Sequence, residues 1–503
     1  MAKSLPASAR PAPPGGREAA ISAGAGRQGS RRAARGPRLS QWPRPHSMTQ
    51  PDPHHRREPD FLQNLRAEFS GWRTWVDRVI VLAYALASGL FVVGFTLAAD
   101  RAFSLFQRLY HWNAWAVLLW MPALTVLLVW ATHRWFPGAS GSGIPQIKAA
   151  LHPALPPEKV GAFASLRLTF AKIVLGVGGF AAGLSIGREG PSVQVAAGVM
   201  QHARRWLSPG STIDARALLV AGGAAGIAAA FNAPLAGVVF AIEELAGRLE
   251  ARSSGLIITA IVLAGMVSVS VFGNVSYFGV IRVPDLNWDL LWPGLLVALV
   301  GGAAGGLFSR LLAMSLTGAP ERLNAWRARW PLKFAAAGGL LVAVIGLASE
   351  GQTFGAGSEA VKRMLAGEME QTGLYALLKA AATWITAWCG VPGGIFAPSL
   401  SVGAGIGHSL AAVIDPTLAP ALIAMGMAAF LAAVTQAPLT AFLIVMEMVD
   451  GHSMVLSLMA SAMLASLVSR MISRPLYEAL ADHMVARIAA APPEKTAENA
   501  PKR

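Results

Sequence analysis

Three glycine-rich loops in this sequence have the composition of an anion-binding site. The loops are Gly141–Gly143, Gly187–Gly190 and Pro392–Gly394, and a proline follows each of them within four residues. Proline suits the first turn of a helix, where an N–H group would have no partner, so each loop is expected to lead into a helix. Backbone N–H groups gathered at the positive end of a helix bind anions without a metal. The alternative is that the glycines only permit close helix packing.

One acidic residue, Glu189, lies inside the second of these loops and within a long apolar stretch. An ionisable group at membrane depth is costly and is typical of a functional site. A carboxylate beside an anion-binding helix terminus competes with the anion, and it loses this attraction when it is protonated. The sequence therefore predicts that Glu189 is both a gate and a proton carrier. The alternative is that Glu189 only pairs with its neighbour Arg188.

A second acidic pair, Glu243 and Glu244, closes the apolar segment that begins at Pro234. If this segment is helical, the two carboxylates lie about 14–15 Å from its proline end. That distance places them near the cytoplasmic mouth of a pathway. Adjacent residues of a helix face about 100° apart, so one acid can have a structural partner while the other faces a water-filled path.

The two halves of the chain repeat one another, and the repeat separates the roles of these two acids. Gly187–Gly198 aligns with Gly394–Gly405 at an offset of 207 residues, and two further segments align in the same order at offsets of 204 and 214. Glu243 aligns with Glu447, whereas Glu244 has no acidic counterpart. We therefore expect Glu243 to be structural and Glu244 to be functional. A solvated charge at a helix end is the alternative for Glu244.

The composition indicates an all-α membrane protein that crosses the bilayer many times. Only 14% of the residues are charged, 54% are hydrophobic, and the mean hydropathy is +0.48. Long apolar spans are expected at 79–99, 114–136, 166–186, 256–273, 292–313 and 333–348. Shorter apolar pieces, broken by Gly and Pro, lie between and after them, at 145–151, 191–203, 215–230, 234–248, 375–389, 398–410, 418–434, 438–449 and 454–472. Paired halves with interrupted helices indicate a transporter whose site lies at the interface of the repeats.

The net charge of +15 does not indicate nucleic-acid binding, because much of it belongs to the N-terminal tail. Residues 1–47 contain nine Lys/Arg and one acid, Glu18. A basic tail before the first span places the N-terminus in the cytoplasm, and an alternative is that translation begins at Met48. The single cysteine, Cys389, excludes an internal disulfide. No cofactor and no metal are expected.

Several motifs resemble those of the CLC chloride channel and transporter family. Three of them, Gly141-Ser-Gly-Ile-Pro145, Gly187-Arg-Glu-Gly-Pro191 and Gly394-Ile-Phe-Ala-Pro398, resemble the anion-filter motifs of that family. Supporting matches follow in the family's order, and they are Phe231-Asn-Ala-Pro-Leu235, Thr435-Gln-Ala-Pro-Leu439 and Arg474-Pro-Leu-Tyr477. The resemblance implies two inverted repeats of tilted, partly discontinuous helices, a homodimer with one pore per subunit, and both termini in the cytoplasm.

The resemblance also implies roles for single residues. Glu189 becomes the external gating glutamate and Glu244 the internal proton glutamate. Ser142 and Tyr477 would offer hydroxyls to a central chloride, with backbone N–H groups from Ile395 and Phe396. The full set of expected chloride-binding residues is Ser142, Gly143, Ile144, Arg188, Gly190, Ile395, Phe396 and Tyr477.

The sequence departs from the family pattern after the first motif. Gln146 and Lys148 stand where the family commonly has Glu, so acids are lost and a base is gained near the intracellular approach. Only 26 residues follow Tyr477, which fits a compact prokaryotic type.

The expected function is proton-coupled chloride exchange across a cell membrane, with no enzyme activity. A passive chloride channel, gated by voltage or pH, is the alternative on the same fold. A membrane enzyme that grips phosphorylated lipid through Arg188 and Arg310 is the alternative from another class.

We expect four parts in the chain. They are a disordered basic tail over 1–60, a first membrane repeat with a lead-in helix over 61–285, a second membrane repeat over 286–475, and a C-terminal helix and tail over 476–503.

Overall fold

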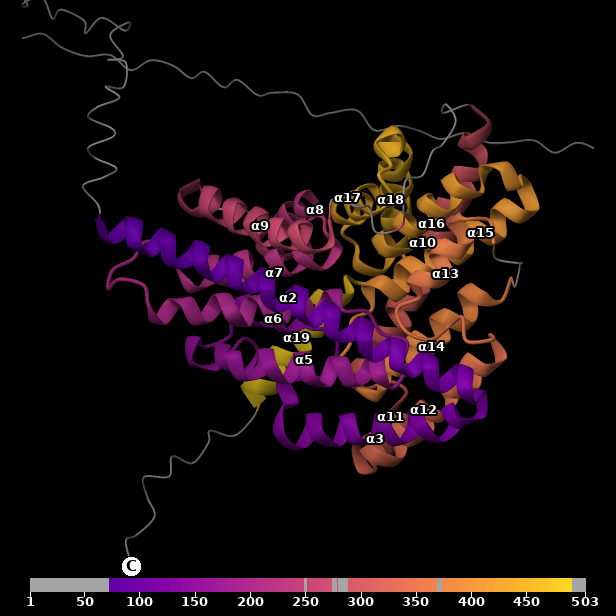
Figure 1. Cartoon of the computed structure of the whole chain (residues 1–503), viewed down its shortest axis with the longest axis horizontal. Helices are drawn as coiled ribbons and strands as arrows, with labels where there is room; N and C mark the ends of the chain where they lie inside the picture. The colour runs from indigo at the N-terminus through magenta and orange to yellow at the C-terminus, as the bar shows by residue number, and fades with distance from the viewer. Residues whose placement is uncertain (1–71, 248–250, 274–277, 279–287, 369–372, 491–503) are drawn as a thin grey trace, which may run out of the picture. The chain divides into compact units, whose positions relative to one another are not determined.

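The computed structural model describes residues 72–247, 251–273, 278, 288–368 and 373–490 (Figure 1). Across these residues the regular secondary structure is helical, apart from one isolated backbone bridge. Within the same ranges, nine helical segments are long and apolar enough to cross a membrane. They correspond to α2 (Trp72–Trp112), α3 (Val117–Trp135), α5 (Leu166–Ala181), α9 (Ala251–Phe272, from Ser254 on), α10 (Leu291–Thr317), α12 (Pro331–Ala348), α15 (Phe396–Ile414), α16 (Ala419–Thr435) and α18 (Val455–Arg470).

Shorter helices lie between and after the long ones, and most of them correspond to the interrupted apolar pieces, whereas those at Glu321–Arg329 and Ser358–Leu365 were not expected. A helix that ends inside a bilayer leaves backbone groups without partners, so such ends must be buried in protein or line a polar cavity. These helices are α4 (Ile144–Leu151), α6 (Glu189–His202), α7 (Ala215–Phe231), α8 (Pro234–Phe240), α11 (Glu321–Arg329), α13 (Ser358–Leu365), α14 (Tyr375–Cys389), α17 (Pro438–Met448) and α19 (Leu476–Ala490).

The structure corrects several expected boundaries. The span expected at 79–99 is part of the 41-residue helix α2, and the span expected at 166–186 ends at Ala181. The piece expected at 398–410 is the longer helix α15. Residues 241–246, expected to continue an α-helix from Pro234, form a π-helix. Residues 61–71, where the lead-in helix was expected to begin, lie outside the described part, as does the whole of the expected tail at 1–60.

Two of the prolines that follow the glycine-rich loops stand slightly inside a helix rather than at its start. Helix α6 begins at Glu189 and α15 begins at Phe396, so Pro191 and Pro398 are the third residues of their helices. The first four N–H groups of a helix have no intrahelical partner, so a proline costs little anywhere in that turn. Glu189 therefore belongs to the first turn of α6 rather than to the loop before it.

In both repeats, a pair of helices packs closely through small residues. Helix α6 packs along α7 in the first repeat, and α15 packs along α16 in the second (Figure 1). A Cβ on Gly403 would collide with the carbonyl oxygen of Gly426, and a Cβ on Gly426 would collide with that of Gly403. Small residues let these backbones touch, which is how membrane helices gain packing energy without a hydrophobic driving force.

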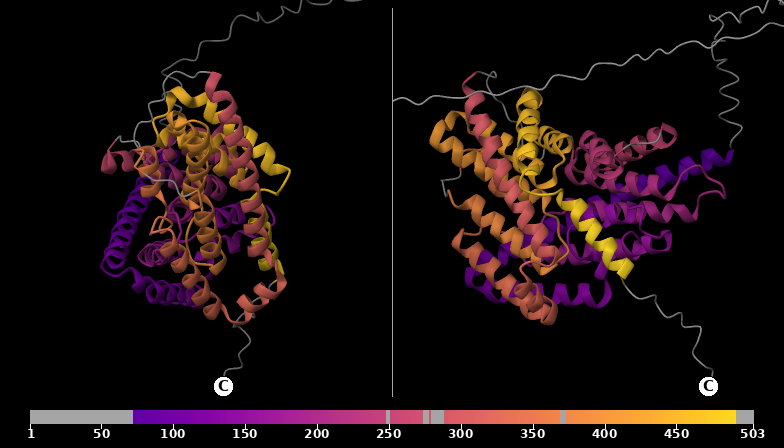
Figure 2. Two further views of the ribbon diagram at one scale, coloured as in Figure 1. Left: turned by 90° about the vertical axis from the view of Figure 1, so that its right-hand side faces the viewer. Right: turned by 180° about the vertical axis from the view of Figure 1, so that it is seen from behind.

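The last helix returns from the second repeat to the first. Helix α19, yellow in Figure 2, packs against α4 and against α10. Tyr477 and Leu476, at its N-terminal end, are both about 1% exposed. The chain therefore places Tyr477 beside the start of α4, although the two lie more than 300 positions apart in the sequence.

Candidate functional site

The three glycine-rich loops meet in space. Gly187 N–H donates to the Gly394 carbonyl and Gly394 N–H donates to the Gly187 carbonyl, both at 2.7 Å, and Gly393 N–H donates to the Gly141 carbonyl at 3.1 Å. A Cβ on Gly190 would collide with Ser142 Oγ. Glycine is therefore required by the close approach of the loops to one another. Packing and anion binding are not competing explanations here, because the same approach brings the free N–H groups together.

Hydrogen-bond donors gather where the loops meet. Ser142 Oγ and Tyr477 Oη lie beside one another, are buried, and have no well-formed hydrogen bond among the described residues. Ile395 and Phe396 are the N-cap and first residue of α15, so their N–H groups have no intrahelical carbonyl to bind. The Tyr477 ring stacks on the Phe396 ring, with centroids 6.1 Å apart and planes 8° apart. Buried polar atoms are normally paired, so this group of donors is suited to an anion.

Glu189 lies at the helix termini that border this group. Its side chain is buried, and Oε2 accepts a hydrogen bond of 3.4 Å from the N–H of Ala397, the second residue of α15. Its neighbour Arg188 donates from Nη1 to Asp100 of α2 at 2.5 Å, and it also acts electrostatically on Glu189. The carboxylate of Glu189 thus occupies a helix N-terminus that would equally attract an anion.

Glu243 and Glu447 each cap a helix of the opposite repeat. Glu243 accepts from the N–H groups of Leu439 and Thr440 in α17, at 3.0 and 2.7 Å. Glu447 accepts from the N–H groups of Leu235 and Ala236 in α8, at 3.3 and 2.8 Å. These bonds satisfy donors that lipid could not, and their reciprocity relates the halves by a local two-fold axis.

Glu244 turns away from its neighbour Glu243. Its side chain is 7% exposed, so it is not a solvated charge at a helix end. Its Oε1 forms an ion pair of 2.8 Å with Lys148 of α4, and Lys148 is one of the two residues that depart from the family pattern. The π-helix over Ala241–Ala246 carries both acids on one wide turn, and π-helical turns are frequent at functional sites.

Two polar side chains hold the first loop in place: Gln146, noted above as a departure from the family pattern, and Lys172, which the sequence analysis did not single out. Gln146 accepts a hydrogen bond from Gly143 N–H at 2.8 Å and donates to the Ser140 carbonyl. Lys172, fully buried in α5, donates to the carbonyls of Ala139 and Gly141 at 2.8 and 2.6 Å.

Lys379, in α14, repeats the arrangement of Lys172 in the second half. It donates to the carbonyls of Thr353 and Gly355 at 2.9 and 2.7 Å. A signal for both lysines was present in the sequence. Each is a charge within an apolar stretch, and they are separated by the same 207 residues that relate Gly187 to Gly394.

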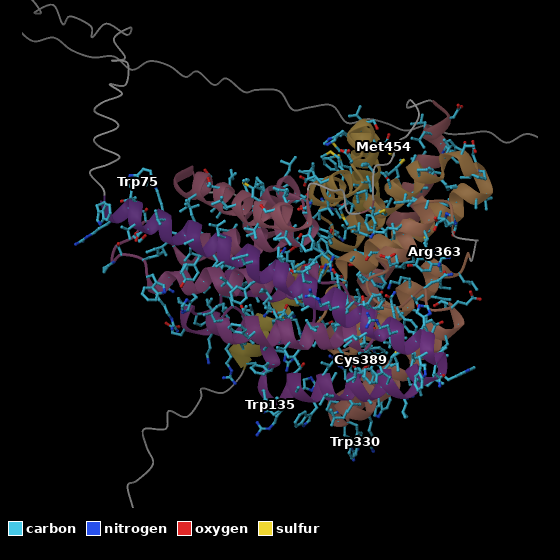
Figure 3. The ribbon with its side chains drawn as sticks, viewed as in Figure 1. Trp75, Trp135, Trp330, Arg363, Cys389 and Met454 are labelled. Carbon is cyan, nitrogen blue, oxygen red and sulfur yellow. The ribbon has the colours of Figure 1, made fainter. Side chains whose placement is uncertain are left out.

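Two cavities flank the loops. One, of about 760 Å³, is lined by Ser142, Ile395 and Tyr477 and has a basic wall with no Asp or Glu among its described lining residues; its cations are Lys159, Arg167, Arg327 and Arg487, with His483. The other, of about 530 Å³, has mixed charges that include Asp100, Arg188 and Arg363. Trp135 and Arg363, from the first and second cavity, are labelled well apart in Figure 3.

Comparisons with known proteins identify this architecture. A family model described as "Voltage gated chloride channel" matches residues 123–470. The chain belongs to the CLC family. Among its CLC relatives, the H(+)/Cl(-) exchange transporter ClcA of Salmonella gallinarum is 30% identical over 416 residues, which are 80% of this chain and 84% of that protein.

Solved CLC structures have the same fold. A slow cyanobacterial Cl-/H+ antiporter is 26% identical, with a TM-score of 0.70, and the match covers 82% of this chain and 98% of that one. A CLC-type fluoride/proton antiporter is 20% identical, with a TM-score of 0.66, over 80% and 97% of the two chains, and at that identity it shows the fold alone. The predicted fold class is confirmed as an all-helical, multi-pass membrane protein of a transporter family. The alternative of a lipid-modifying enzyme is therefore excluded.

Proposed function

We propose that this CLC protein exchanges chloride for protons across a cell membrane. The proposal rests on the position of the Glu189 carboxylate. This carboxylate is buried and accepts a hydrogen bond from the N-terminus of α15. It lies beside the hydrogen-bond donors of Ser142, Tyr477, Ile395 and Phe396. A carboxylate and an anion cannot both be held by the same N–H groups. When Glu189 is protonated, it no longer holds these N–H groups, and the anion can bind them. This competition couples the movement of protons to the movement of chloride.

The second acid of the proposed exchange is Glu244. Both Glu189 and Glu244 act electrostatically on the Tyr477 hydroxyl, so this buried hydroxyl lies near both acids. Glu244 would take up protons from the cytoplasm and Glu189 would pass them to the other side. A passive chloride channel is the second candidate, and the Lys148 ion pair, which occupies Glu244, is the observation that favours it.

Chloride is the anion that we propose, with Gly143, Ile144, Arg188 and Gly190 completing the set of chloride-binding residues. The fluoride/proton antiporter among the structural neighbours makes the anion a question for experiment. Hydroxyl and N–H donors without a metal hold a halide weakly enough for it to leave, which transport requires.

Flux measurements on the reconstituted protein test the proposal. Liposomes that contain the full chain receive a chloride gradient, and chloride efflux and proton influx are recorded together, with fluoride and nitrate in parallel. We expect chloride to drive protons uphill. In Glu189→Gln and in Glu244→Gln, chloride should still move while the proton flux falls to the level of empty liposomes. Chloride movement without proton movement in the unaltered protein would instead establish a channel.

We also propose a homodimer with one pore per subunit and with both termini in the cytoplasm. Exposed large apolar side chains, such as Leu119 of α3 and Leu456 of α18, fit a surface covered by lipid or by a second copy. Light scattering in detergent would give the mass of the assembly. Protease treatment of sealed vesicles would give the side on which the termini lie.

A further inference from the structure

Lys148 and Glu244 form a charged pair at the inner end of the site, and neither charge is fully in water. The distance from Nζ to Oε1 is 2.8 Å, and the side chains are 21% and 7% exposed. The ammonium is therefore the member of the pair that lies closer to solvent. A proton that binds Glu244 must therefore compete with a cation that already holds the carboxylate.

The other charged groups near Glu244 do not replace this lysine. Glu243, its neighbour on the π-helix, is engaged with α17. On α19, Glu478 and the Tyr477 hydroxyl interact electrostatically with Glu244, and neither of them carries a positive charge.

The remaining helices packed against the π-helix bring one further cation. Helix α8 has no charged residue, and Glu447 of α17 is engaged with α8. Arg216 of α7 directs Nη1 to the Leu151 carbonyl at 3.0 Å. Of the described residues, Lys148 is thus the cation that the structure places in contact with Glu244.

We propose that Lys148 is a positioning residue for proton uptake: it holds Glu244 as a carboxylate, and the pair must separate before Glu244 can carry a proton to the interior. The step is balanced without another reactant. Glu244 gains one proton from cytoplasmic water and becomes neutral, and its attraction for the ammonium is lost. Lys148, already partly exposed, then turns to water, and loss of the proton toward Glu189 restores the pair.

The pair also connects the proton pathway to the anion site through one short helix. Lys148 is the fifth residue of α4, whose first residue follows the loop that carries Ser142. The helix is only eight residues long, so a displacement of Lys148 acts close to the Ser142 loop. This inference rests on the proposed exchange, since a channel would have no proton uptake for Lys148 to control.

The pH dependence of proton flux tests the proposal. An opposite charge in contact with a carboxylate lowers the pH at which the carboxylate binds a proton, by about one to three units. Lys148→Gln removes this charge, so the internal pH for half-maximal proton flux should rise by about one unit or more. Lys148→Arg keeps the charge and should keep the midpoint near that of the unaltered protein.

A repeat-related lysine provides the matched control. Lys362 aligns with Lys148 at the offset of 214, and its side chain is 48% exposed beside Glu359. Lys362→Gln makes the same chemical change and should leave the midpoint in place. A midpoint in Lys148→Gln equal to that in Lys362→Gln overturns the inference.

Two further arms keep the outcome decisive. If Lys148→Gln does not give a monodisperse protein in detergent, Lys148→Met carries the same test, because it keeps most of the length of the unbranched side chain and removes the charge. If the unaltered protein moves chloride without protons, the proposed exchange fails. If it couples the two and only the midpoint shift is missing, exchange stands and the role of Lys148 fails.

Discussion

At the scale of single residues, the hydroxyls of Ser142 and Tyr477 are the groups whose removal has the most direct consequence. A hydrogen bond to a charged group contributes about 1.5–3 kcal/mol, which corresponds to roughly a tenfold to hundredfold change in affinity. Tyr477→Phe removes one hydroxyl and keeps the ring that stacks on Phe396. We therefore expect chloride binding, measured by calorimetry on the protein in detergent, to weaken about tenfold or more in Tyr477→Phe and in Ser142→Ala.

The control for this prediction is Tyr375→Phe. Tyr375 is also buried, but its hydroxyl is hydrogen-bonded to Ser401 at 2.5 Å, so it is engaged within the protein. This substitution should change stability rather than chloride affinity. Unchanged affinity in both Tyr477→Phe and Ser142→Ala would place the anion elsewhere.

The roles of single residues differ in how far the sequence could reveal them. The offset of 204 residues between Glu243 and Glu447 predicted a structural pair, and the reciprocal helix caps give it that role. The Lys148 ion pair could not be predicted, because it joins residues 96 positions apart and depends on the direction in which the π-helix turns Glu244. The periodicity of the sequence does not indicate the direction in which a π-helix points a side chain.

At the scale of helices, the caps between the repeats should carry stability. Glu243→Gln leaves one oxygen to accept two N–H groups and places an amide N–H₂ beside the second. Leaving a buried donor unsatisfied costs about 1–3 kcal/mol. We expect the thermal unfolding midpoint in detergent to fall clearly in Glu243→Gln and in Glu447→Gln.

An exposed acid supplies the comparison for the caps. Glu359, whose side chain is 70% exposed, forms a surface pair with Lys362, and such pairs contribute little to stability. Glu359→Gln should therefore leave the unfolding midpoint nearly unchanged. The cap interpretation is wrong if Glu243→Gln is as stable as Glu359→Gln.

Helix existence was predictable and helix ends were less so. The long apolar spans and the proline-led short pieces all correspond to helices, because hydropathy and proline placement are local properties. The extension of α2 to Trp112, beyond the expected 99, could not be predicted in this way. Its last turns include Phe106, whose ring lies edge-on against Phe354 of a distant segment, and this tertiary packing overrides the polar residues of that stretch.

At the scale of the whole molecule, the basic cavity should concentrate anions before they reach the site. Arg327 and Arg487 come from α11 and α19 and line the same cavity. Burial and the neighbouring Arg487 lower the pKa of His483, so near neutral pH the arginines rather than this histidine supply the charge. Such a field raises the rate of approach of an anion, and added salt screens it.

Chloride flux at two ionic strengths tests this field. Arg327→Gln and Arg487→Gln should slow flux at about 10 mM ionic strength, and the difference should shrink at about 150 mM, where charges are screened beyond roughly 8 Å. Arg322→Gln, an exposed residue of α11 outside the described lining of the cavity, removes the same charge and should slow flux less. Equal slowing by all three would assign the effect to net charge.

The reciprocal caps have a consequence for biosynthesis. Ribosomes complete α8 about 200 residues before they reach Glu447, so the N–H groups of Leu235 and Ala236 enter the bilayer before their acceptor exists. Without the second repeat, these two N–H groups lose the acceptor that the structure gives them, and lipid cannot replace it. The first repeat would have to wait at the translocon, or beside a helper protein, until the second repeat arrives. Separately produced halves should accordingly be degraded when expressed alone and should protect one another when expressed together.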